Sequence, residues 1–393
     1  MDIREIARGY RAGEKDRAKL GYNPAERELK EGLAANPRDC ERVSIREMFE
    51  ELVPDGREAV RNFNPKYASS AVAIREANAV QSGAFANVSG IVVTTMVEDS
   101  AKHEDFIGDL LCTTRSSPYQ TERLPMISDI GDEAELVGEG EAYPLAGVTE
   151  DWIDTPPTKK RGKIVPLTKE AVFFDRTGEL LSKAGDVGYW LGVNREKRII
   201  DVATGQTDTY NRKGRGATTT YGDSSGSHDW DNLAASNALV DWTDIDVAQQ
   251  LADEIVDPNT GEPVMIQFKE ILVPKALKAA AERIISATEI RFGAGGSTST
   301  SGTVAVSRQP SVANQLKLVT NAWVSDRTSS TSTWFIGDFK AAFEYLENWP
   351  ITVVQAPQGS HEEFKYDIVI QWKASEMGVA HARRPRLVVK CTA

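Results

Sequence analysis

The chain has 393 residues, of which 40% are hydrophobic and 26% charged, with a formal net charge of −12. This length allows two or three compact units, and the composition is ordinary for a globular protein. The negative balance argues against general phosphate binding, because a nucleic-acid surface needs a basic field. The three cysteines, Cys40, Cys112 and Cys391, are too few and too widely spaced for a disulfide framework or a zinc cluster, which favours a reducing compartment.

No targeting or membrane segment is expected. The N-terminal residues 1–6 carry charges where a signal peptide would need an apolar core. No apolar run reaches the roughly 18 residues that a membrane-spanning helix requires.

Residues 1–62 are rich in charge and in helix-forming residues, and three prolines divide them into short helices. Ser44 and Glu47 have the spacing of a capping box in front of an apolar run. Because apolar residues are sparse, we expect no independent core here. The region is interpreted as a helical arm that packs on other subunits or on the body, with a partly disordered tail as the alternative. Residues 69–111 are more apolar and are expected to form a second arm.

The segment 132–172 is expected to be a long excursion with two oppositely charged arms. Its basic arm contains Pro166. Proline has no backbone N–H to donate to a neighbouring strand, so this arm is predicted to form an edge strand. Trp152 is a large apolar residue near the expected tip. Such an excursion cannot bury both faces on its own body and needs a partner. The two arms are expected to pair within one subunit or between subunits, and the candidate contact residues are Asp132, Glu133, Glu135, Glu139, Glu141, Trp152, Lys159, Lys160, Arg161 and Lys163.

A long helix is predicted over residues 177–202, directly after the excursion. Leu180, Ala184, Val187 and Leu191 recur at helical spacing and form one apolar stripe. Glycines within the same stretch weaken the helix intrinsically but permit another backbone to approach closely. We therefore expect packing to stabilise this helix.

The remaining chain mixes helices and strands without the regular alternation of a parallel α/β sheet, which indicates the α+β class. Asp338 is expected to cap one of these helices. The predicted helices cover 244–256, 339–346 and a segment opening at Pro274, and the predicted strands cover 265–273, 315–324, 334–336, 351–354, 366–372 and 386–390.

No catalytic constellation is visible in the sequence. The four histidines are far apart, and the pair His361-Glu362 lacks the second histidine of a metal-binding helix. Neither the glycines around Arg215 nor those at 293–296 have the context of a phosphate-binding loop. The basic run from Arg383 to Arg386 leads into an apolar strand, which favours a core or subunit edge. No catalytic residue, metal or cofactor is predicted.

The order of these features resembles the major capsid proteins of tailed bacteriophages, which have the Hong Kong 97-type fold. The resemblance extends from about residue 85 to the end of the chain. It depends on an acidic strand, a hairpin with a basic turn, the run 175–181 and a long helix, followed by the series 335–342 and the returning strands. The resemblance implies an α+β fold with an N-terminal arm, an extended β-hairpin loop, a long spine helix, and peripheral and axial domains.

The resemblance also implies a division of the chain. The expected parts are the N-terminal arm (1–112), the entry to the peripheral domain (113–131), the extended hairpin loop (132–172), the spine helix and peripheral domain (173–240), the axial domain (241–333), the peripheral return (334–383) and the terminal strand (384–393).

Two departures from the family pattern lead to further expectations. The arm is short for a cleavable scaffolding segment, so a separate scaffold, or none, is expected. Some family members join subunits covalently through a loop lysine and an asparagine in the C-terminal polar loop. The corresponding loop here, 356–364, contains Gln358 and no asparagine, so no such cross-link is predicted.

The function implied is a structural shell protein rather than an enzyme. Its expected partners are other copies of itself in pentamers and hexamers, with scaffold, portal and decoration proteins, and a double-stranded DNA genome enclosed without specific binding. Assembly is expected in the host cytoplasm and the final location is the virion. Before assembly, the arm and the hairpin are expected to be free or bent. A bacterial nanocompartment shell of the encapsulin type and an enzyme of unrecognised class are the alternatives.

Overall fold

A computed structural model describes most of the chain, and it contains two compact units, which are described separately. Unit 1 comprises residues 1–104, 160–194 and 349–377, and unit 2 comprises 105–159, 195–348 and 378–393. The described residues are 6, 8–10, 12–13, 17, 23–36, 44–53, 56–62, 83–127, 137–139, 150–168, 179–223, 230–257, 261–286, 289–292, 305–308, 316–356, 365–366 and 368–393.

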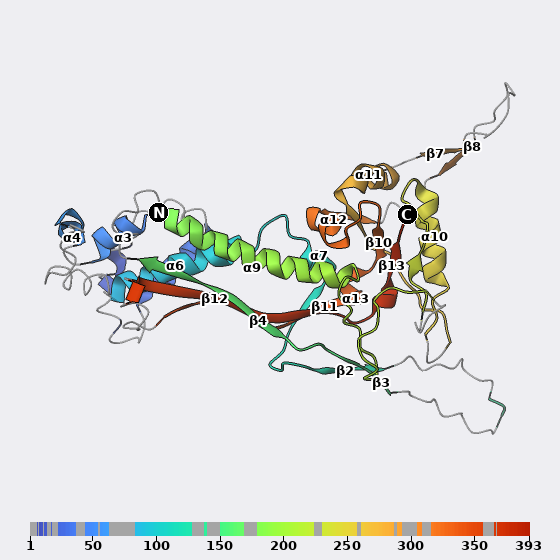
Figure 1. The fold of residues 1–393 in the computed structure, drawn as a ribbon, viewed down its shortest axis with the longest axis horizontal. Helices are drawn as coiled ribbons and strands as arrows, with labels where there is room; N and C mark the ends of the chain where they lie inside the picture. The colour runs from blue at the N-terminus through green and yellow to red at the C-terminus, as the bar shows by residue number, and fades with distance from the viewer. Residues whose placement is uncertain are drawn as a thin grey trace. The chain divides into compact units, whose positions relative to one another are not determined.

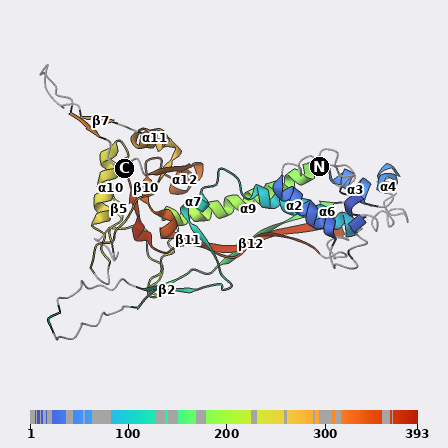
Figure 2. The ribbon, with the colours of Figure 1, turned by 180° about the vertical axis from the view of Figure 1, so that it is seen from behind.

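The N-terminal part of unit 1 consists of helices (Figures 1 and 2). Helix α2 begins with a proline after Asn23, whose side chain accepts a hydrogen bond from the amide of Ala25. Helix α3 begins directly after Ser44 as predicted, but this serine makes no side-chain capping hydrogen bond, so the predicted capping box is absent. The helices are α2 (Pro24–Ala35), α3 (Ile45–Leu52), α4 (Gly56–Asn62) and α6 (Gly83–Ser100).

These helices share an apolar core with α6, in agreement with the expectation that residues 1–62 have no independent core and pack on the rest of the chain. Helices α2 and α3 both pack on α6. Their apolar residues are few but occupy one face at helical spacing, so nearly all of them are buried. The buried set includes Leu29, Leu33, Ile45, Met48, Phe49 and Leu52, with Val88, Val92, Val93 and Val97 of α6.

The predicted long helix is α9 (Glu179–Ala203). Ala184 and Leu191 are buried in the core of unit 1, and Val187 packs against it, which confirms the described part of the predicted stripe. A Cβ atom at Gly188 would collide with the backbone of Val97 in α6. This glycine therefore allows the close helix approach that the sequence indicated.

Unit 2 is organised around a five-stranded sheet with the order β5-β13-β10-β6-β9. Its central strand β10 is antiparallel to both neighbours, while β6 and β9 are parallel. Trp334 and Ile336 belong to one core cluster and Phe335 to the other, so the sheet is covered on both faces. The strands are β5 (Leu233–Ala234), β6 (Glu270–Pro274), β9 (Lys317–Asn321), β10 (Trp334–Gly337) and β13 (Val388–Cys391).

Short helices complete unit 2, and several differ from the predicted bounds. The predicted helix 339–346 ends at Ala342, because the alternating residues Phe343 and Tyr345 are strand formers that continue into β11. The predicted strand 315–324 is divided into β9 and a helix capped by Asn321. The helices are α7 (Gly108–Leu111), α10 (Trp242–Asp253), α11 (Lys278–Ser286), α12 (Ala322–Thr328) and α13 (Phe339–Ala342), with 3-10 turns η3 (Lys275–Leu277) and η5 (Pro385–Leu387).

A four-stranded sheet has the order β1-β11-β12-β4, and β4 is an edge strand as predicted. Two smaller sheets pair β2 with β3 and β7 with β8. The chain is therefore of the α+β class. The remaining strands are β1 (Thr113–Ser116), β2 (Arg123–Ile127), β3 (Glu150–Asp154), β4 (Lys159–Thr168), β7 (Glu289–Phe292), β8 (Ala305–Arg308), β11 (Phe343–Gln355) and β12 (Ile368–Ala382).

Candidate assembly site at the root of the extended loop

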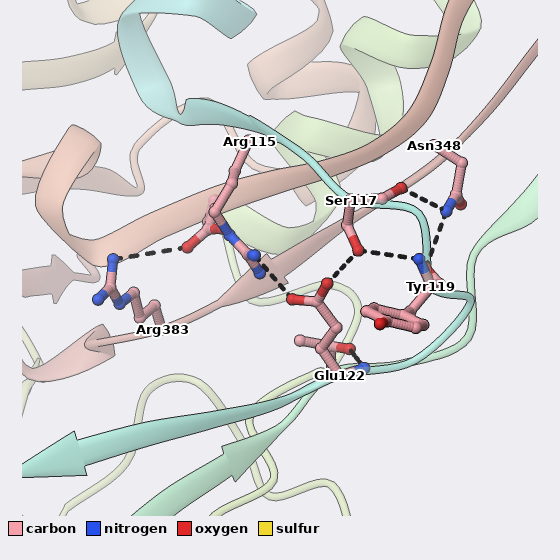
Figure 3. Close-up of polar contacts among 8 residues, drawn as sticks. Arg115, Ser117, Tyr119, Glu122, Asn348 and Arg383 are labelled. Atoms are coloured by element: carbon pink, nitrogen blue, oxygen red, sulfur yellow. Dashed lines mark hydrogen bonds and ion pairs between the residues drawn. The ribbon is translucent and has the colours of Figure 1, made fainter.

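The chain leaves the body of unit 2 just after β1. This strand lies parallel to β11, in register from Thr113 opposite Glu344 to Ser116 opposite Glu347. The Asn348 side chain then donates hydrogen bonds to the carbonyl oxygens of Ser117 at 2.9 Å and Tyr119 at 2.8 Å. One amide group thus satisfies two backbone acceptors where the pairing of β1 with β11 ends, and it fixes the direction of the departing chain (Figure 3).

An ionic network reinforces this departure point. The Arg115 guanidinium pairs with Glu344 and also lies 2.7 Å from a carboxylate oxygen of Glu122. Arg383 lies 3.6 Å from the second oxygen of Glu344, which is buried. A buried carboxylate requires such compensation, because removal of a charge from water costs several kcal/mol. We call Arg115, Ser117, Glu122, Glu344, Asn348 and Arg383 the root network.

Glu122 connects this network to the returning chain. Its carboxylate accepts a hydrogen bond from the Ser117 hydroxyl, and this bond is the main cause that lowers the pKa of Glu122. Its backbone amide donates to the Thr155 hydroxyl at 2.8 Å, and the Thr155 amide donates back to its carbonyl at 2.9 Å. The outgoing and returning chains are therefore joined at one residue.

A buried histidine lies in the electrostatic field of the same network. His381 has no exposed surface, and neither ring nitrogen has a hydrogen-bond partner among the described residues. Burial lowers its pKa to about 4, although the charge of Glu344 partly offsets this effect. The ring is therefore neutral at pH 7, which avoids a third cation near Arg115 and Arg383.

The ribbon formed by β2 and β3 extends from this root. Trp152 lies in β3, where it is half-buried under the Arg123 guanidinium, 4.9 Å from the ring centroid. Arg123 also pairs with Asp154 at 2.9 Å. The expectation that Trp152 lies near a hairpin tip is wrong, because Trp152 is paired within the β2–β3 ladder, and its ring has a partner within its own chain.

A buried ion pair attaches β3 to unit 2. Arg212 and Asp151 lie 2.6 Å apart, and both side chains are almost fully buried. The amide of Lys213 donates to the carbonyl of Trp152, and the amide of Asp154 donates to the carbonyl of Asn211. Residues 150–154 are therefore bonded on both sides rather than free.

The two charged arms do not pair with one another in the described part of the chain. The basic arm forms β4, which pairs with β12, whereas β3 belongs to a different sheet. A Cβ at Gly162 would lie only 2.5 Å from the carbonyl oxygen of Ala374, so this glycine permits the close approach of β4 to β12. On the acidic arm, Asp132, Glu133, Glu135 and Glu141 lie outside the described residues, and Glu139 is exposed.

The predicted basic residues all lie in β4. Lys159, Lys160 and Lys163 have exposed side chains, and that of Arg161 is half-buried. The Lys160 ammonium lies 5.8 Å from the centre of the Trp349 ring. Lysines on an edge strand discourage indiscriminate strand addition.

Glu196 is a functional residue that the sequence did not indicate. From α9 it accepts hydrogen bonds from the amides of Ile107 at 2.7 Å and Gly108 at 2.8 Å, just before β1. Burial raises the pKa of its carboxyl to about 7. Neither this residue nor the root network has a local sequence signal, because Arg115 and Glu344 are separated by more than 200 residues.

The described residues contain no group of three potential metal ligands. None of their helices has the combination of length and apolar character needed to cross a membrane.

Comparisons with known proteins identify the family. No curated protein sequence matches the chain. Similar solved structures include Gordonia phage Cozz, with 12% identity and a TM-score of 0.45 over 73% of this chain and 86% of that chain. Microbacterium phage Oxtober96 has 13% identity and a TM-score of 0.45 over 74% and 92%. A virus-like particle from Pyrococcus furiosus has 10% identity and a TM-score of 0.40 over 76% and 97%.

The sequence model of a family described as phage capsid protein matches residues 153–391. This match covers more than half of the chain and includes β4, α9 and nearly all of the five-stranded sheet. The chain belongs to the phage capsid protein family and is a virus shell protein.

Proposed function

We propose that this chain is the major capsid protein of a tailed phage. Many copies would close into an icosahedral shell of pentamers and hexamers around a double-stranded DNA genome, and assembly would take place in the host cytoplasm. The observation that carries this proposal is the family match across residues 153–391. The net charge of −12 also suits a wall that must not bind tightly to densely packed DNA.

The contact between neighbouring copies would use the oppositely charged segments. Exposed Lys160 and Lys163 on the β4 edge would face the acidic residues 132–141 of the next subunit. Opposite charges support this pairing, and so does the position of β4 at the edge of its sheet. Individual exposed ion pairs contribute only about 0–1 kcal/mol, but a lattice repeats them and thereby fixes register.

The root network would give this contact a defined geometry. A loop that binds a neighbour gains affinity when its base is ordered in advance, because less conformational entropy is lost on assembly. The joined chains at Glu122 and Thr155 and the buried pair of Arg212 and Asp151 supply that order. The expected mobility before assembly would then not extend to β3 and β4.

The proposed role requires no catalytic residue or cofactor. Scaffold, portal and decoration proteins are proposed as partners, with the scaffold as a separate chain. The division into N-terminal arm, extended loop, spine helix, peripheral domain and axial domain also remains a proposal.

Particles purified from a host that produces the phage provide the test. We expect this chain to be the most abundant protein in particles that contain double-stranded DNA, as measured by mass spectrometry and nuclease-resistant absorbance at 260 nm. Particles that contain an enzyme and no genome would favour the nanocompartment alternative. Recovery of the chain only as a ligand-binding monomer would favour an enzyme.

A further inference from the structure

Helices α10 and α11 cover the same face of the five-stranded sheet of unit 2, at opposite ends. Ala248 and Ala252 of α10 and Ala281 and Ile284 of α11 are buried in one core cluster. Helix α10 contacts β5 and β13, whereas α11 contacts β6 and β9. Both views of the ribbon draw the two helices apart, around β10 (Figures 1 and 2). Each helix leaves its other face uncovered within the described residues.

The outer face of α10 is acidic and partly apolar. Asp246, Asp253 and Glu254 are exposed, and Val247 between them exposes 47% of its surface. No lysine or arginine occurs between residues 235 and 265 to balance these charges. Carboxylates without basic neighbours in the sequence favour contact with a surface of opposite charge.

The opposite end of the sheet presents the complementary chemistry. Lys275, Lys278 and Arg283 are exposed on η3 and α11, and Lys317 is exposed on the adjoining edge strand β9. Among these residues Glu282 is a single opposing charge, 3.6 Å from Lys278. The small residues Ala276 and Ala279 are also exposed and leave room for a neighbouring side chain.

We propose that α10 of one copy docks on α11 and β9 of the next copy. When α10 of one copy contacts α11 and β9 of the next, each copy keeps its second patch free for a further neighbour, so the contact generates a head-to-tail arrangement. Repetition of this contact closes a ring when the rotation between copies permits. This inference rests on the proposed shell function and assigns the residues by which the copies around one axis recognise each other.

The charges would mainly determine specificity and orientation. Complementary charges accelerate the encounter and penalise wrong orientations, whereas Val247 and the exposed alanines supply the apolar contact. Because the carboxylates and ammonium groups are exposed, the contact should weaken as salt screens them.

Charge reversal tests this docking directly, under conditions in which the wild-type chain forms shells, alone or with its scaffold. One variant carries Asp246→Lys and Glu254→Lys, and a second carries Lys275→Glu and Lys278→Glu. A third variant combines all four substitutions and so exchanges the two charges. The control is Asp99→Lys with Asp326→Lys on α6 and α12, which raises the net charge by the same amount as the first variant does.

We expect each of the first two variants to lower the yield of closed particles at least about ten-fold, because like charges then face each other. The combined variant should recover most of the yield, because the two patches again carry opposite charges. Circular dichroism and thermal melting should remain as in wild type, because all substituted residues are exposed. Particles would be counted by electron microscopy and size-exclusion chromatography.

Normal particle yield from either of the first two variants would overturn the docking while the proposed function stands. Loss of particles without recovery in the combined variant would overturn the pairing of α10 with α11. Failure of the wild-type chain itself to form particles, even with scaffold, would instead contradict the proposed function, and this inference with it.

Discussion

The centre of the five-stranded sheet and the root network both contain buried side chains, but they use opposite chemistry. Trp334, Phe335 and Ile336 in β10 have no exposed surface and are surrounded by apolar residues. In the root network the buried group is the carboxylate of Glu344, whose partners Arg115 and Arg383 are themselves partly exposed. Apolar burial is non-directional, whereas a buried ion pair requires one geometry.

The apolar centre of the sheet mainly determines the stability of unit 2, whereas the root network mainly determines the direction in which the chain leaves it. The centre of the sheet stabilises unit 2 whatever the solvent pH. The root network contributes less net stability because desolvation offsets pairing, but it determines where the chain leaves the body and returns. Mutations in the two regions should therefore differ in size and in their response to pH.

Truncation of Trp334 should have the largest effect. The Trp334→Ala substitution leaves a cavity and also removes the hydrogen bond from its indole nitrogen to the Asn237 carbonyl at 2.8 Å. We expect a loss of about 3–5 kcal/mol in the free energy of unfolding, equal at pH 5 and pH 7. Urea unfolding of the unassembled subunit measures it. A loss that depends strongly on pH would remove the distinction between the two regions.

Acid should destabilise the root network through His381. The pKa of this buried ring is lowered to about 4 in the folded protein, against about 6.5 when unfolded. The unfolded chain then binds the extra proton, so the contribution of His381 is present above pH 6.5 and is lost as the pH falls towards 4. We expect about 3 kcal/mol to be lost across this window.

The control for this effect is His381→Leu, which cannot titrate. When the two curves are aligned at pH 7, the urea midpoint of wild type should fall below that of His381→Leu as the pH falls towards 4. Parallel curves would show that His381 does not contribute to the acid sensitivity.

Removal of one ionic partner should cost less. Arg115→Ala leaves Glu344 buried beside Arg383 alone, and we expect about 2–3 kcal/mol, because Arg115 is itself partly exposed. Addition of Glu344→Gln should recover part of the loss. Arg123→Ala, which breaks an exposed pair with Asp154, should cost about 1 kcal/mol or less. Equal losses in Arg115→Ala and Arg123→Ala would mean that the network is not energetically special.

Glu196 should respond to pH in the opposite direction to His381. Burial raises its folded pKa to about 7. The folded state therefore holds the proton more tightly, so the contribution is present below the unfolded pKa and is lost as the pH rises towards 7. We expect a loss of about 2 kcal/mol between pH 4.5 and 6. The urea midpoint of Glu196→Gln should lack this decrease, and its persistence would contradict the assignment.

Neighbouring subunits in mature particles should not become covalently cross-linked. Because the loop 356–364 contains Gln358 and no asparagine, mature particles boiled in detergent should release a single band near 43.1 kDa. A ladder of covalent multiples would contradict this prediction.

The sequence predicts the elements that have a regular spacing of apolar residues or a proline that restricts their place in a sheet. The helix α9 and its stripe follow from the spacing of Ala184, Val187 and Leu191, and the edge position of β4 follows from Pro166. The sequence does not predict the core of the N-terminal helices, because its few apolar residues are buried only when α2 and α3 meet α6. It also misses the root network, since no local pattern connects Arg115 to Glu344.

The sequence does not reveal which strand the basic arm pairs with. Opposite charges in 132–141 and 159–163 indicated a hairpin, but charge does not specify a strand partner. The pairing of β4 with β12 depends on backbone complementarity at Gly162, where a side chain would collide with Ala374. The size of Trp152 alone indicates a residue that contacts another subunit, although the Arg123 guanidinium of its own chain lies over the ring.

The most direct test of the account is negative-stain electron microscopy of the protein expressed alone, supported by measurement of its size in solution. The account predicts closed shells or tubes, or shells that appear when the scaffold protein is added. A uniform small species both without and with scaffold would contradict the assignment as a self-assembling capsid protein.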